Sequence, residues 1–359
     1  MKIGILTMHK VLNYGSALQA YALQEILVKK GCKVEIIDYD FPYVNYNLKD
    51  KLLSIIYFLR YSYIRKRIIG FKLFYKKYFN LSIPFRKHRI NKYFFKYDAY
   101  VTGSDQVWNP KYIGSDTTFL LDFVPESNIK ISYGSSFSCK QIPNDIEHLY
   151  KKYLLRYNNL SVREKNAVEL VDNLINKKPH LVLDPTLLLD ADDWSRLLPK
   201  ESSINFSEGY ILVYSLTYAF NPFPYMSSMI EELHSKTGLK VLSLMSPISL
   251  SNIKCQIIVP ASPIEFLGYI KNAAYVVTNS FHGVAFSINF QKNLLAITQR
   301  SDDDRIYNLL EELDLINCAY ELNSSKKLDI EFLDTKVSSN KLLKMRDKSK
   351  QFLFSALNI

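Results

Sequence analysis

The sequence predicts an α/β protein with two domains, each built on a parallel β-sheet that helices cover on both faces. Short runs of β-branched and aromatic residues alternate with segments of helical periodicity along most of the chain, a pattern typical of parallel sheets. With 359 residues, the chain exceeds the usual size of one domain. We expect two Rossmann-like domains that face each other across a cleft and bind ligands at the carboxyl ends of their strands.

The first domain is expected to cover residues 1–190 and to begin with a strand–helix–strand unit. Residues 3–7 and 34–38 have strand composition, and 16–30 predict a helix that ends at Gly31. The loop before this helix does not match G-x-G-x-x-G, so the dinucleotide-binding fingerprint is absent. Further strands are expected at 99–102, from 130, at 160–163 and at 180–184, with helices at about 143–155 and from 164.

The second domain is expected at 191–335, after a polar junction at about 185–208. Its predicted strands are 210–214, 240–244, 257–259, 274–277 and 294–298. Ser262 and Glu265 form a capping box with Pro263 at the first helical position, so a helix begins there. The remaining segment, 336–359, predicts a basic amphipathic helix that is a candidate to return to the first domain.

A basic and aromatic insertion is expected in the first domain at about 45–97. Residues 49–97 hold 14 Lys and Arg, 14 Tyr and Phe and one acidic residue, whereas the rest of the chain has 32 basic and 34 acidic residues. Such helices bind membrane surfaces, nucleic acid or other anions. Two interpretations stay open, a helical insertion with a solvated face and contact with an anionic membrane through 50–97. We do not expect nucleic acid as a partner.

Composition excludes several classes of protein. The chain is 48% hydrophobic and has no apolar run of 18 residues, so it is neither disordered nor membrane-spanning. The N-terminus has the composition of a strand and not of a signal peptide. The four cysteines are isolated, which favours a reducing cytoplasm over a zinc site or a disulfide framework. We expect a cytoplasmic protein without a metal, with the inner face of the membrane as an alternative location.

The most informative motif is T-N-S-F-H-G at 278–283, which lies between a predicted strand and a predicted helix. His282 therefore falls in the first turn of a helix that Asn279 or Ser280 caps. The free N–H groups and the positive end of the helix dipole form an anion site there. A purely structural histidine, in a cap or in the core, is the alternative.

Other polar residues also lie at the ends of predicted strands or just beyond them. They are Ser104, Asp105, Gln106, Ser135, Ser136, Arg163 and Asp184. One such residue is often only a helix cap, but this edge of a parallel sheet is where α/β folds place their chemistry. Together they indicate a site at the carboxyl ends of the strands.

The chain carries five short motifs, N-Y-G-S-A-L-Q-A-Y-A-L at 13–23, G-S-D-Q-V-W at 103–108, S-V-R-E at 161–164, D-P-T at 184–186 and S-F-H-G at 280–283. In these motifs it resembles the polysaccharide pyruvyl transferase family. They occur in the family in this order. The resemblance covers about residues 1–310, whereas 41–97 and the C-terminal tail lie outside it.

The resemblance implies a glycosyltransferase-B-like fold and transfer of the enolpyruvyl unit of phosphoenolpyruvate onto two sugar hydroxyls. The products would be a pyruvate ketal and phosphate, with phosphoenolpyruvate as co-substrate and no cofactor. His282 matches the family histidine and would act as the general acid that protonates the methylene carbon of the donor. Such reactions serve bacterial surface polysaccharides, capsule and exopolysaccharide, and their acceptors are often linked to polyprenyl diphosphate.

Donor binding requires positive potential, because phosphoenolpyruvate carries a carboxylate and a phosphate. The candidate donor-binding residues are Arg163, Ser280, Phe281, Gly283, Arg300 and Arg305. Arg163 matches the family arginine and would clamp the donor, with a surface ion pair to an Asp as the alternative. Some family members have an arginine where this chain has Ser280, so Arg300 and Arg305 are candidates to replace it.

Acceptor binding is assigned to the loops of the first domain. Asp105 is the candidate general base for an acceptor hydroxyl, with a capping role as the alternative. The candidate acceptor-binding residues are Asn13, Tyr14, Gln19, Ser104, Gln106, Trp108, Ser135 and Ser136. Trp108 would act by stacking on the sugar, and His9, also at a strand end, is a further ligand candidate.

Two rival functions stay open. One is a sugar-nucleotide-dependent glycosyltransferase of the same architecture, although no acidic ribose-binding residue is obvious. The other is a non-catalytic protein that binds anionic glycans through the basic segment.

Overall fold

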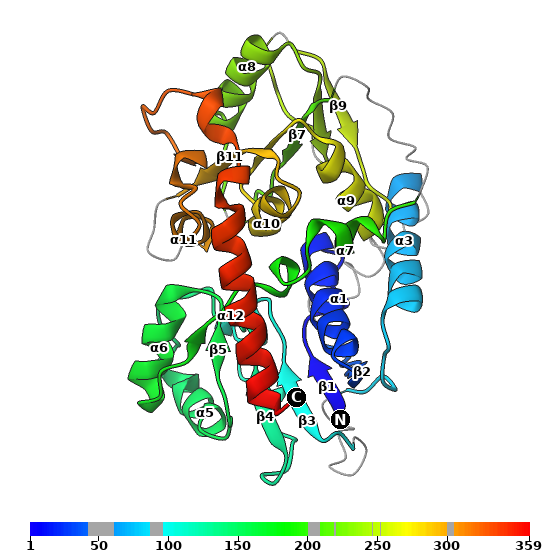
Figure 1. Cartoon of the computed structure of the whole chain (residues 1–359), viewed down its shortest axis with the longest axis vertical. Helices are drawn as coiled ribbons and strands as arrows, with labels where there is room; N and C mark the ends of the chain where they lie inside the picture. Colours follow the sequence, from blue (N-terminus) through cyan, green and yellow to red (C-terminus); the bar gives the residue numbers. More distant parts are fainter. Residues whose placement is uncertain are drawn as a thin grey trace. The chain divides into compact units, whose positions relative to one another are not determined.

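The computed structural model shows an α/β chain with parallel sheets in two compact units (Figure 1). It describes residues 1–41, 61–86, 96–199, 209–218, 220–245, 247–251, 253–299 and 305–359. The first unit comprises Met1–Arg65, Lys72–Leu189 and Met345–Ile359, and the second comprises Lys66–Phe71 and Asp190–Lys344. Among the described helices, none is long and apolar enough to cross a membrane.

The first unit contains a parallel sheet with the strand order β2-β1-β3-β4. The strands are β1 (Lys2–Leu6), β2 (Lys33–Ile36), β3 (Ala99–Thr102) and β4 (Ile129–Ser132). Single bridges from β4 and the loop after it lead on to the short pair β5 (Ser161–Val162) and β6 (His180–Leu181). Chain order reverses where β3 pairs with β1 on the side opposite β2, and such switch points are where open α/β sheets bind ligands.

Helices pack around this sheet and bury its strands. They are α1 (Tyr14–Lys29), α4 (Pro110–Ile113), α5 (Asn144–Leu154) and α6 (Lys165–Ile175), with 3₁₀ turns at Thr118–Leu120 and Pro185–Leu187. Every residue of β3 is buried, as expected for a strand covered on both faces. Helix α1 is buried along most of its length, because it lies against β2 and the 185–187 turn.

The C-terminal helix α12 (Ser339–Leu357) belongs to the first unit from Met345 onward. The Ser349 hydroxyl accepts a hydrogen bond from the backbone N–H of Leu183 at 3.0 Å, and Arg346 Nε donates to the carbonyl of Leu187 at 2.6 Å. The Phe352 ring lies 4.7 Å from the ring of His180. Both chain ends therefore lie in the first unit (Figure 1).

The predicted insertion at 45–97 is described only in part, because 42–60 and 87–95 lie outside the described residues. Within it, α3 (Ser62–Tyr78) is a helix that carries six basic residues and no acidic one. Phe74 is buried, and its ring meets the ring of Tyr21 on α1 at 6.2 Å. Lys66, Lys72 and Lys76 are exposed.

The second unit contains a six-stranded parallel sheet with the order β12-β11-β10-β7-β8-β9. The strands are β7 (Ile211–Tyr214), β8 (Val241–Leu244), β9 (Cys255–Ile258), β10 (Tyr275–Thr278), β11 (Asn293–Thr298) and β12 (Ala319–Glu321). The chain runs outward from β7 to β9, then returns to β10 on the other side of β7. This is the doubly wound order, and its switch point lies between β7 and β10.

The helices of the second unit lie before, between and after these strands in the chain. They are α7 (Ala191–Ser195), α8 (Tyr225–Thr237), α9 (Pro263–Asn272), α10 (Phe281–Asn289) and α11 (Arg305–Glu312), with 3₁₀ turns at Ile316–Cys318, Ile330–Leu333 and Lys336–Ser338. Ser262 caps α9 as predicted, by accepting from the backbone N–H of Glu265 at 3.2 Å. The Glu265 carboxylate accepts from the N–H of Ala261 at 2.9 Å, one residue before the position that a full capping box uses. Trp194 is fully buried and meets Phe286 of α10 at 5.1 Å.

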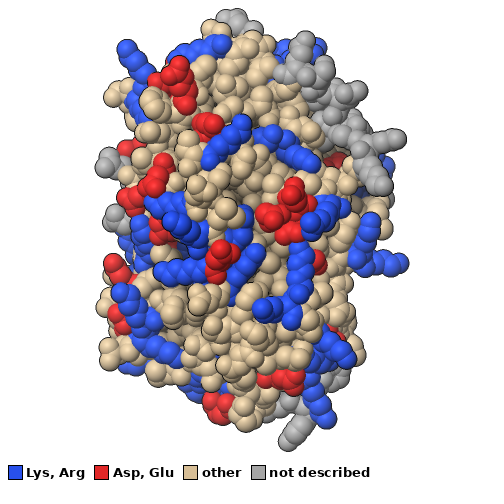
Figure 2. Space-filling model, in the orientation of Figure 1, with Lys and Arg blue, Asp and Glu red and all other residues tan. Residues whose placement is uncertain are grey.

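Surface charge is mixed on the face drawn in Figure 2. Lys and Arg lie beside Asp and Glu over much of this face, although the whole chain has a formal net charge of +11. No single broad basic patch dominates it.

Candidate functional site

The T-N-S-F-H-G motif lies at the switch point of the second sheet, where β10 turns into α10. Ser280 is the N-cap, and its hydroxyl accepts from the N–H of Gly283 at 3.4 Å. Thr278 Oγ1 donates to the carbonyl of Tyr214 at 2.6 Å and accepts from the N–H of Ser280 at 3.0 Å. A Cβ at position 283 would lie 2.5 Å from Thr278 Oγ1, so only glycine lets the first turn of α10 approach the strand this closely.

His282 lies in the first turn of α10 and is nine-tenths buried, with Nε2 shielded from solvent. Its ring meets the ring of Phe281 edge to face at 5.4 Å. The Arg305 guanidinium, at the start of α11, lies 5.7 Å from the centre of the Phe281 ring. The structure thus brings a histidine, a helix N-terminus and an arginine to one end of α10, whereas Arg300 lies outside the described residues.

Asn279 joins the two loops that flank the switch point. Its Oδ1 accepts from the N–H of Leu216 at 2.8 Å, and its Nδ2 donates to the carbonyl of Leu216 at 2.9 Å. Asn279 is therefore a clamp between the β10 and β7 loops, while Ser280 makes the cap.

Two residues at this edge were missed by the sequence analysis. Ser215 follows β7 and Thr298 ends β11, and both have a buried hydroxyl oxygen with no hydrogen-bond partner among the described residues. A buried hydroxyl without a partner is costly unless a ligand or water completes it. Their position at strand ends was the available signal, and small hydroxyl residues are too common there to stand out.

In the first unit, Asp105 lies beyond the end of β3, near the switch point of that sheet. Its backbone has a φ of 76°, which is unusual for a residue other than glycine. Its carbonyl accepts from the N–H of Ser136 at 3.0 Å. Its carboxylate accepts from the N–H of Gln106 at 2.9 Å and from the hydroxyl of Ser16 at 2.5 Å. Such backbone geometry is often held at functional sites.

Ser16 is a buried residue of the first turn of α1, and the sequence analysis did not select it. Its N–H donates to Asn13, the N-cap of α1, at 3.2 Å, and its hydroxyl faces Asp105. Ser16 stands in the N-Y-G-S motif, but sequence spacing does not show that its partner is Asp105.

Arg163 is held in a buried cage of carboxylates. Its Nη1 lies 2.5 Å from Asp184, its Nη2 3.5 Å from Asp105 and its Nε 3.8 Å from Glu164. Burial lowers the pKa of Arg163, but attraction by these three carboxylates outweighs burial, so the net pKa is raised. The guanidinium stays charged and orients Asp105. The expected surface ion pair is in fact a buried one, and contact with the donor stays a prediction.

Several predicted acceptor residues lie in the core and fix the loops. Ser104 Oγ donates to the carbonyl of Gly134 at 2.9 Å, Ser135 Oγ to that of Gly103 at 3.0 Å, and Gln19 Nε2 to Thr7 Oγ1 at 2.9 Å. Tyr14 and Ser136 are fully buried as well. These residues act on the site by shaping it.

Trp108 corrects the sequence prediction. It is fully buried, its Nε1 donates to the carbonyl of Phe119 at 3.1 Å, and its ring packs on Phe137 at 5.2 Å. Because no face of the indole reaches the surface, Trp108 cannot stack on a sugar in this arrangement. Asn13 and Gln106 are partly exposed, so they are the predicted acceptor residues that a sugar can reach.

His9 is fully buried and bound within the first unit. Its Nε2 lies 3.0 Å from Asp38 Oδ1 and its Nδ1 3.1 Å from the carbonyl of Thr7, while Lys10 Nζ lies 2.6 Å from the same carboxylate. Burial raises the pKa of Asp38, but the hydrogen bonds and charges of His9 and Lys10 together outweigh burial. The net pKa of Asp38 is therefore lowered. This geometry makes His9 structural and does not present it to a ligand.

No group of three or more His, Cys, Asp or Glu side chains in the described part of the chain is arranged to hold a metal ion.

Comparison with known proteins adds a family and a fold. The sequence model described as polysaccharide pyruvyl transferase matches residues 13–301. No curated protein matches the chain. Among solved structures, MnaA from S. aureus with UDP is 12% identical with a TM-score of 0.52, covering 99% of this chain and 97% of that one. A Listeria monocytogenes structure described as a UDP-N-acetylglucosamine 2-epimerase is 11% identical with a TM-score of 0.50, covering 99% and 90%. These similarities show a glycosyltransferase-B-like fold.

Proposed function

Because the chain belongs to the polysaccharide pyruvyl transferase family, we propose that it transfers the enolpyruvyl unit of phosphoenolpyruvate onto two hydroxyls of one sugar. The observation that carries the proposal is the position of His282, in the first turn of α10 at the switch point of its sheet. A helix N-terminus favours bound anions, and Arg305 adds a positive charge beside the same turn.

The proposed reaction begins with proton transfer from His282 to the methylene carbon of the donor. The adjacent carbon becomes electron-poor, and the first sugar hydroxyl forms a C–O bond to it while its proton passes to Asp105. The second hydroxyl then forms a C–O bond to the same carbon, and the bond to the phosphate oxygen breaks. The phosphate leaves with the second hydroxyl proton, so the products are the ketal and inorganic phosphate.

The charge of the donor supports an acid role for His282. A helix dipole alone disfavours the imidazolium form, whereas a dianion beside the ring favours it. Donor binding would therefore favour the protonated form of His282, which is the form that acts as an acid. In the first unit, Arg163 Nη2 lies 3.5 Å from Asp105 Oδ1, and a positive charge at that distance favours the carboxylate form that a general base requires.

The test is phosphate release from phosphoenolpyruvate with a panel of lipid-linked galactose, mannose and amino-sugar acceptors. The wild-type chain should release phosphate and form a ketal with at least one acceptor. His282→Gln should reduce the rate by about 10²–10⁴-fold, whereas the exposed His148→Gln on α5 should not change it. A His282→Gln variant with full activity would overturn the acid assignment.

A sugar-nucleotide-dependent transferase is the second candidate, since MnaA, which shares the fold, was solved with UDP. Incubation with labelled sugar nucleotides distinguishes this candidate from a pyruvyl transferase. Sugar transfer without phosphate release from phosphoenolpyruvate would favour this candidate.

We also propose that the acceptor is linked to polyprenyl diphosphate and that α3 contacts the anionic membrane that holds it. Ile69 and Leu73 are 49% and 60% exposed on α3, and exposed Lys66, Lys72 and Lys76 flank them. Lysines attract anionic lipid, and aliphatic side chains between them gain by entering the interface. A soluble polyanion that bound only the lysines would leave Ile69 and Leu73 in water, so a membrane surface accounts for both kinds of side chain.

Vesicle sedimentation tests the membrane contact. Lys66→Glu/Lys72→Glu/Lys76→Glu should abolish binding to phosphatidylglycerol vesicles, whereas Lys151→Glu/Lys152→Glu on the exposed face of α5 should not. Equal binding by both variants would contradict a contact through α3.

A further inference from the structure

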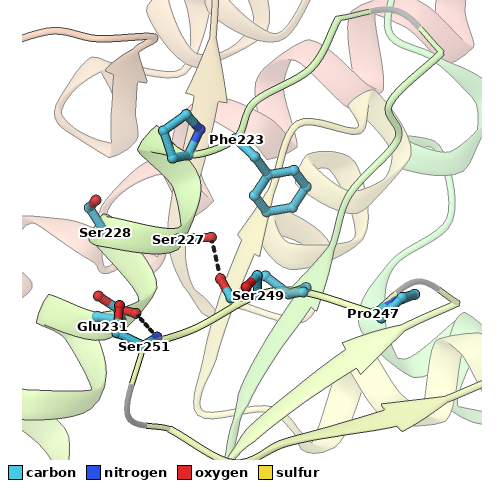
Figure 3. Close-up of a pocket in the computed structure, with 9 residues that line it drawn as sticks. Phe223, Ser227, Ser228, Glu231, Pro247, Ser249 and Ser251 are labelled. Atoms are coloured by element: carbon cyan, nitrogen blue, oxygen red, sulfur yellow. Dashed lines mark hydrogen bonds between the residues drawn. The ribbon is translucent and has the colours of Figure 1, made fainter.

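The second unit contains a pocket of about 410 Å³ that is separate from the His282 turn (Figure 3). It lies between the first turns of α8 and the 247–251 segment that follows β8, so it opens beyond the carboxyl ends of β7 and β8. Its volume falls within the range of small-molecule sites. The site residues assigned above do not line it.

Hydrogen bonds fix both walls of the pocket. Ser227 Oγ on α8 donates to the carbonyl of Ser249 at 2.9 Å, and the N–H of Ser251 donates to Glu231 Oε1 at 2.5 Å. These two bonds tie the 247–251 segment to α8 at successive turns. The pocket is therefore formed before any ligand arrives.

The lining combines apolar surface with hydroxyl and carboxylate groups. Phe223 projects toward the 247–251 segment and, with Ile248, supplies the apolar side (Figure 3). Ser228 and Glu231 supply a hydroxyl and a carboxylate. No Lys, Arg or His is among the described residues that line it.

This chemistry excludes some ligands and favours others. A phosphate or carboxylate would meet the Glu231 carboxylate without a compensating cation in the lining. A sugar ring has the complementary character, because its C–H faces pack on apolar and aromatic surface while its hydroxyls donate to carboxylate oxygens. A neutral saccharide fits this lining better than a charged ligand.

Strand spacing relates the pocket to the histidine turn. β8 pairs with β7, and β7 pairs with β10, so the ends of β8 and β10 are about 10 Å apart at the usual strand separation. A short oligosaccharide spans such a distance.

We propose that this pocket binds a neutral sugar ring of the acceptor, next to the ring that is modified. The proposal rests on the proposed function for the identity of the acceptor, whereas glycan binding itself can be measured without phosphoenolpyruvate. It predicts that oligosaccharide acceptors bind more tightly than single sugars, because their second ring makes additional contacts in the pocket.

The test is saturation-transfer NMR and titration of the full chain with uncharged methyl glycosides and disaccharides of galactose, glucose and mannose. At least one glycan should bind. Phe223→Leu, which keeps apolar volume but removes the ring, should weaken binding by roughly three- to tenfold. Glu231→Gln should weaken it several-fold, while Glu232→Gln, its neighbour paired with Lys236, should bind as the wild type does.

Several outcomes would overturn the proposal. These are the absence of glycan binding at millimolar concentration, equal binding by all three variants, and binding of uridine in place of glycans. In kinetics, Phe223→Leu should raise KM for an oligosaccharide acceptor and leave a single-sugar acceptor unchanged. A chain that binds glycans through Phe223 yet never releases phosphate contradicts the proposed function and not the pocket.

Discussion

The hydroxyl of Ser16 donates a 2.5 Å hydrogen bond to Oδ2 of Asp105, and so joins the first turn of α1 to the loop after β3 across 89 positions of sequence. Oδ1 of the same carboxylate accepts from the N–H of Gln106 and faces Arg163. Asp105 is thus oriented from three directions.

Asp105→Asn should reduce the rate of ketal formation by about 10²–10⁴-fold, because the amide cannot take up the hydroxyl proton. The KM for phosphoenolpyruvate should change little, since Asp105 is assigned to the acceptor hydroxyl and not to the donor. Steady-state phosphate release measures both. Asp145→Asn, at the start of α5, serves as the control. Full activity of Asp105→Asn would contradict the assignment of Asp105 as the general base.

Ser16→Ala should lower kcat by removing the hydrogen bond that orients Asp105, and Ser16→Thr should restore much of it because the hydroxyl is kept. The pH profile separates catalysis from folding. If Ser16 positions the base, the part of the kcat/KM profile that rises with pH should shift in Ser16→Ala. It should not shift in Asn13→Ser, which keeps the oxygen that caps α1. An unshifted profile with normal kcat would contradict the role of Ser16.

Asp184→Asn should destabilise the first unit by about 3–5 kcal/mol, because it removes a partner of a buried guanidinium. Urea unfolding followed through Trp108 fluorescence, in a Trp194→Phe background, measures the first unit selectively. Asp40→Asn, in the same unit, removes the partner of the exposed Arg86 and should change stability by less than about 1 kcal/mol. Equal effects of the two substitutions would show that the carboxylate cage contributes little.

Asp38 should make the chain less stable in acid. Because its pKa is lowered in the folded state, the unfolded chain binds more protons at mildly acidic pH, so stability rises with pH there. The contribution is complete above the unfolded pKa of about 3.9 and is lost as pH falls through the lower folded value. Thermal unfolding from pH 3 to pH 6 should show a flatter acid limb for Asp38→Asn than for the wild type.

The matched control for this pH series is Asp40→Asn, which removes an exposed pair with Arg86. Its acid limb should match that of the wild type. Identical limbs for all three proteins would mean that the His9–Asp38–Lys10 group does not govern acid stability.

The fold could be predicted well because hydrophobic periodicity is local. The strands before Asp105 and Thr278 were predicted, and the side chains that follow them lie at sheet edges as expected. Strand β12 was not predicted, because three residues give too short a periodic signal.

The site was predicted less completely, because its geometry depends on contacts between distant segments. Arg163 was predicted by its motif, but its local sequence does not indicate that Asp105 and Asp184, from distant segments, would join Glu164 around it. Trp108 was predicted to stack on a sugar because its motif follows a strand end, whereas Phe137 and Phe119 bury it from elsewhere in the chain. The pairing of Ser16 with Asp105 had no sequence signal.

The Asn279 clamp constrains how this protein can diversify. The loop that starts near Leu216 runs on to Phe223, so one end is tied to the histidine turn and the other lines the pocket. Insertions or deletions in this loop would strain the amide clamp at one end or move the aromatic wall at the other. Changes of glycan preference should therefore arise by substitution at fixed loop length, with Asn279 retained as the anchor.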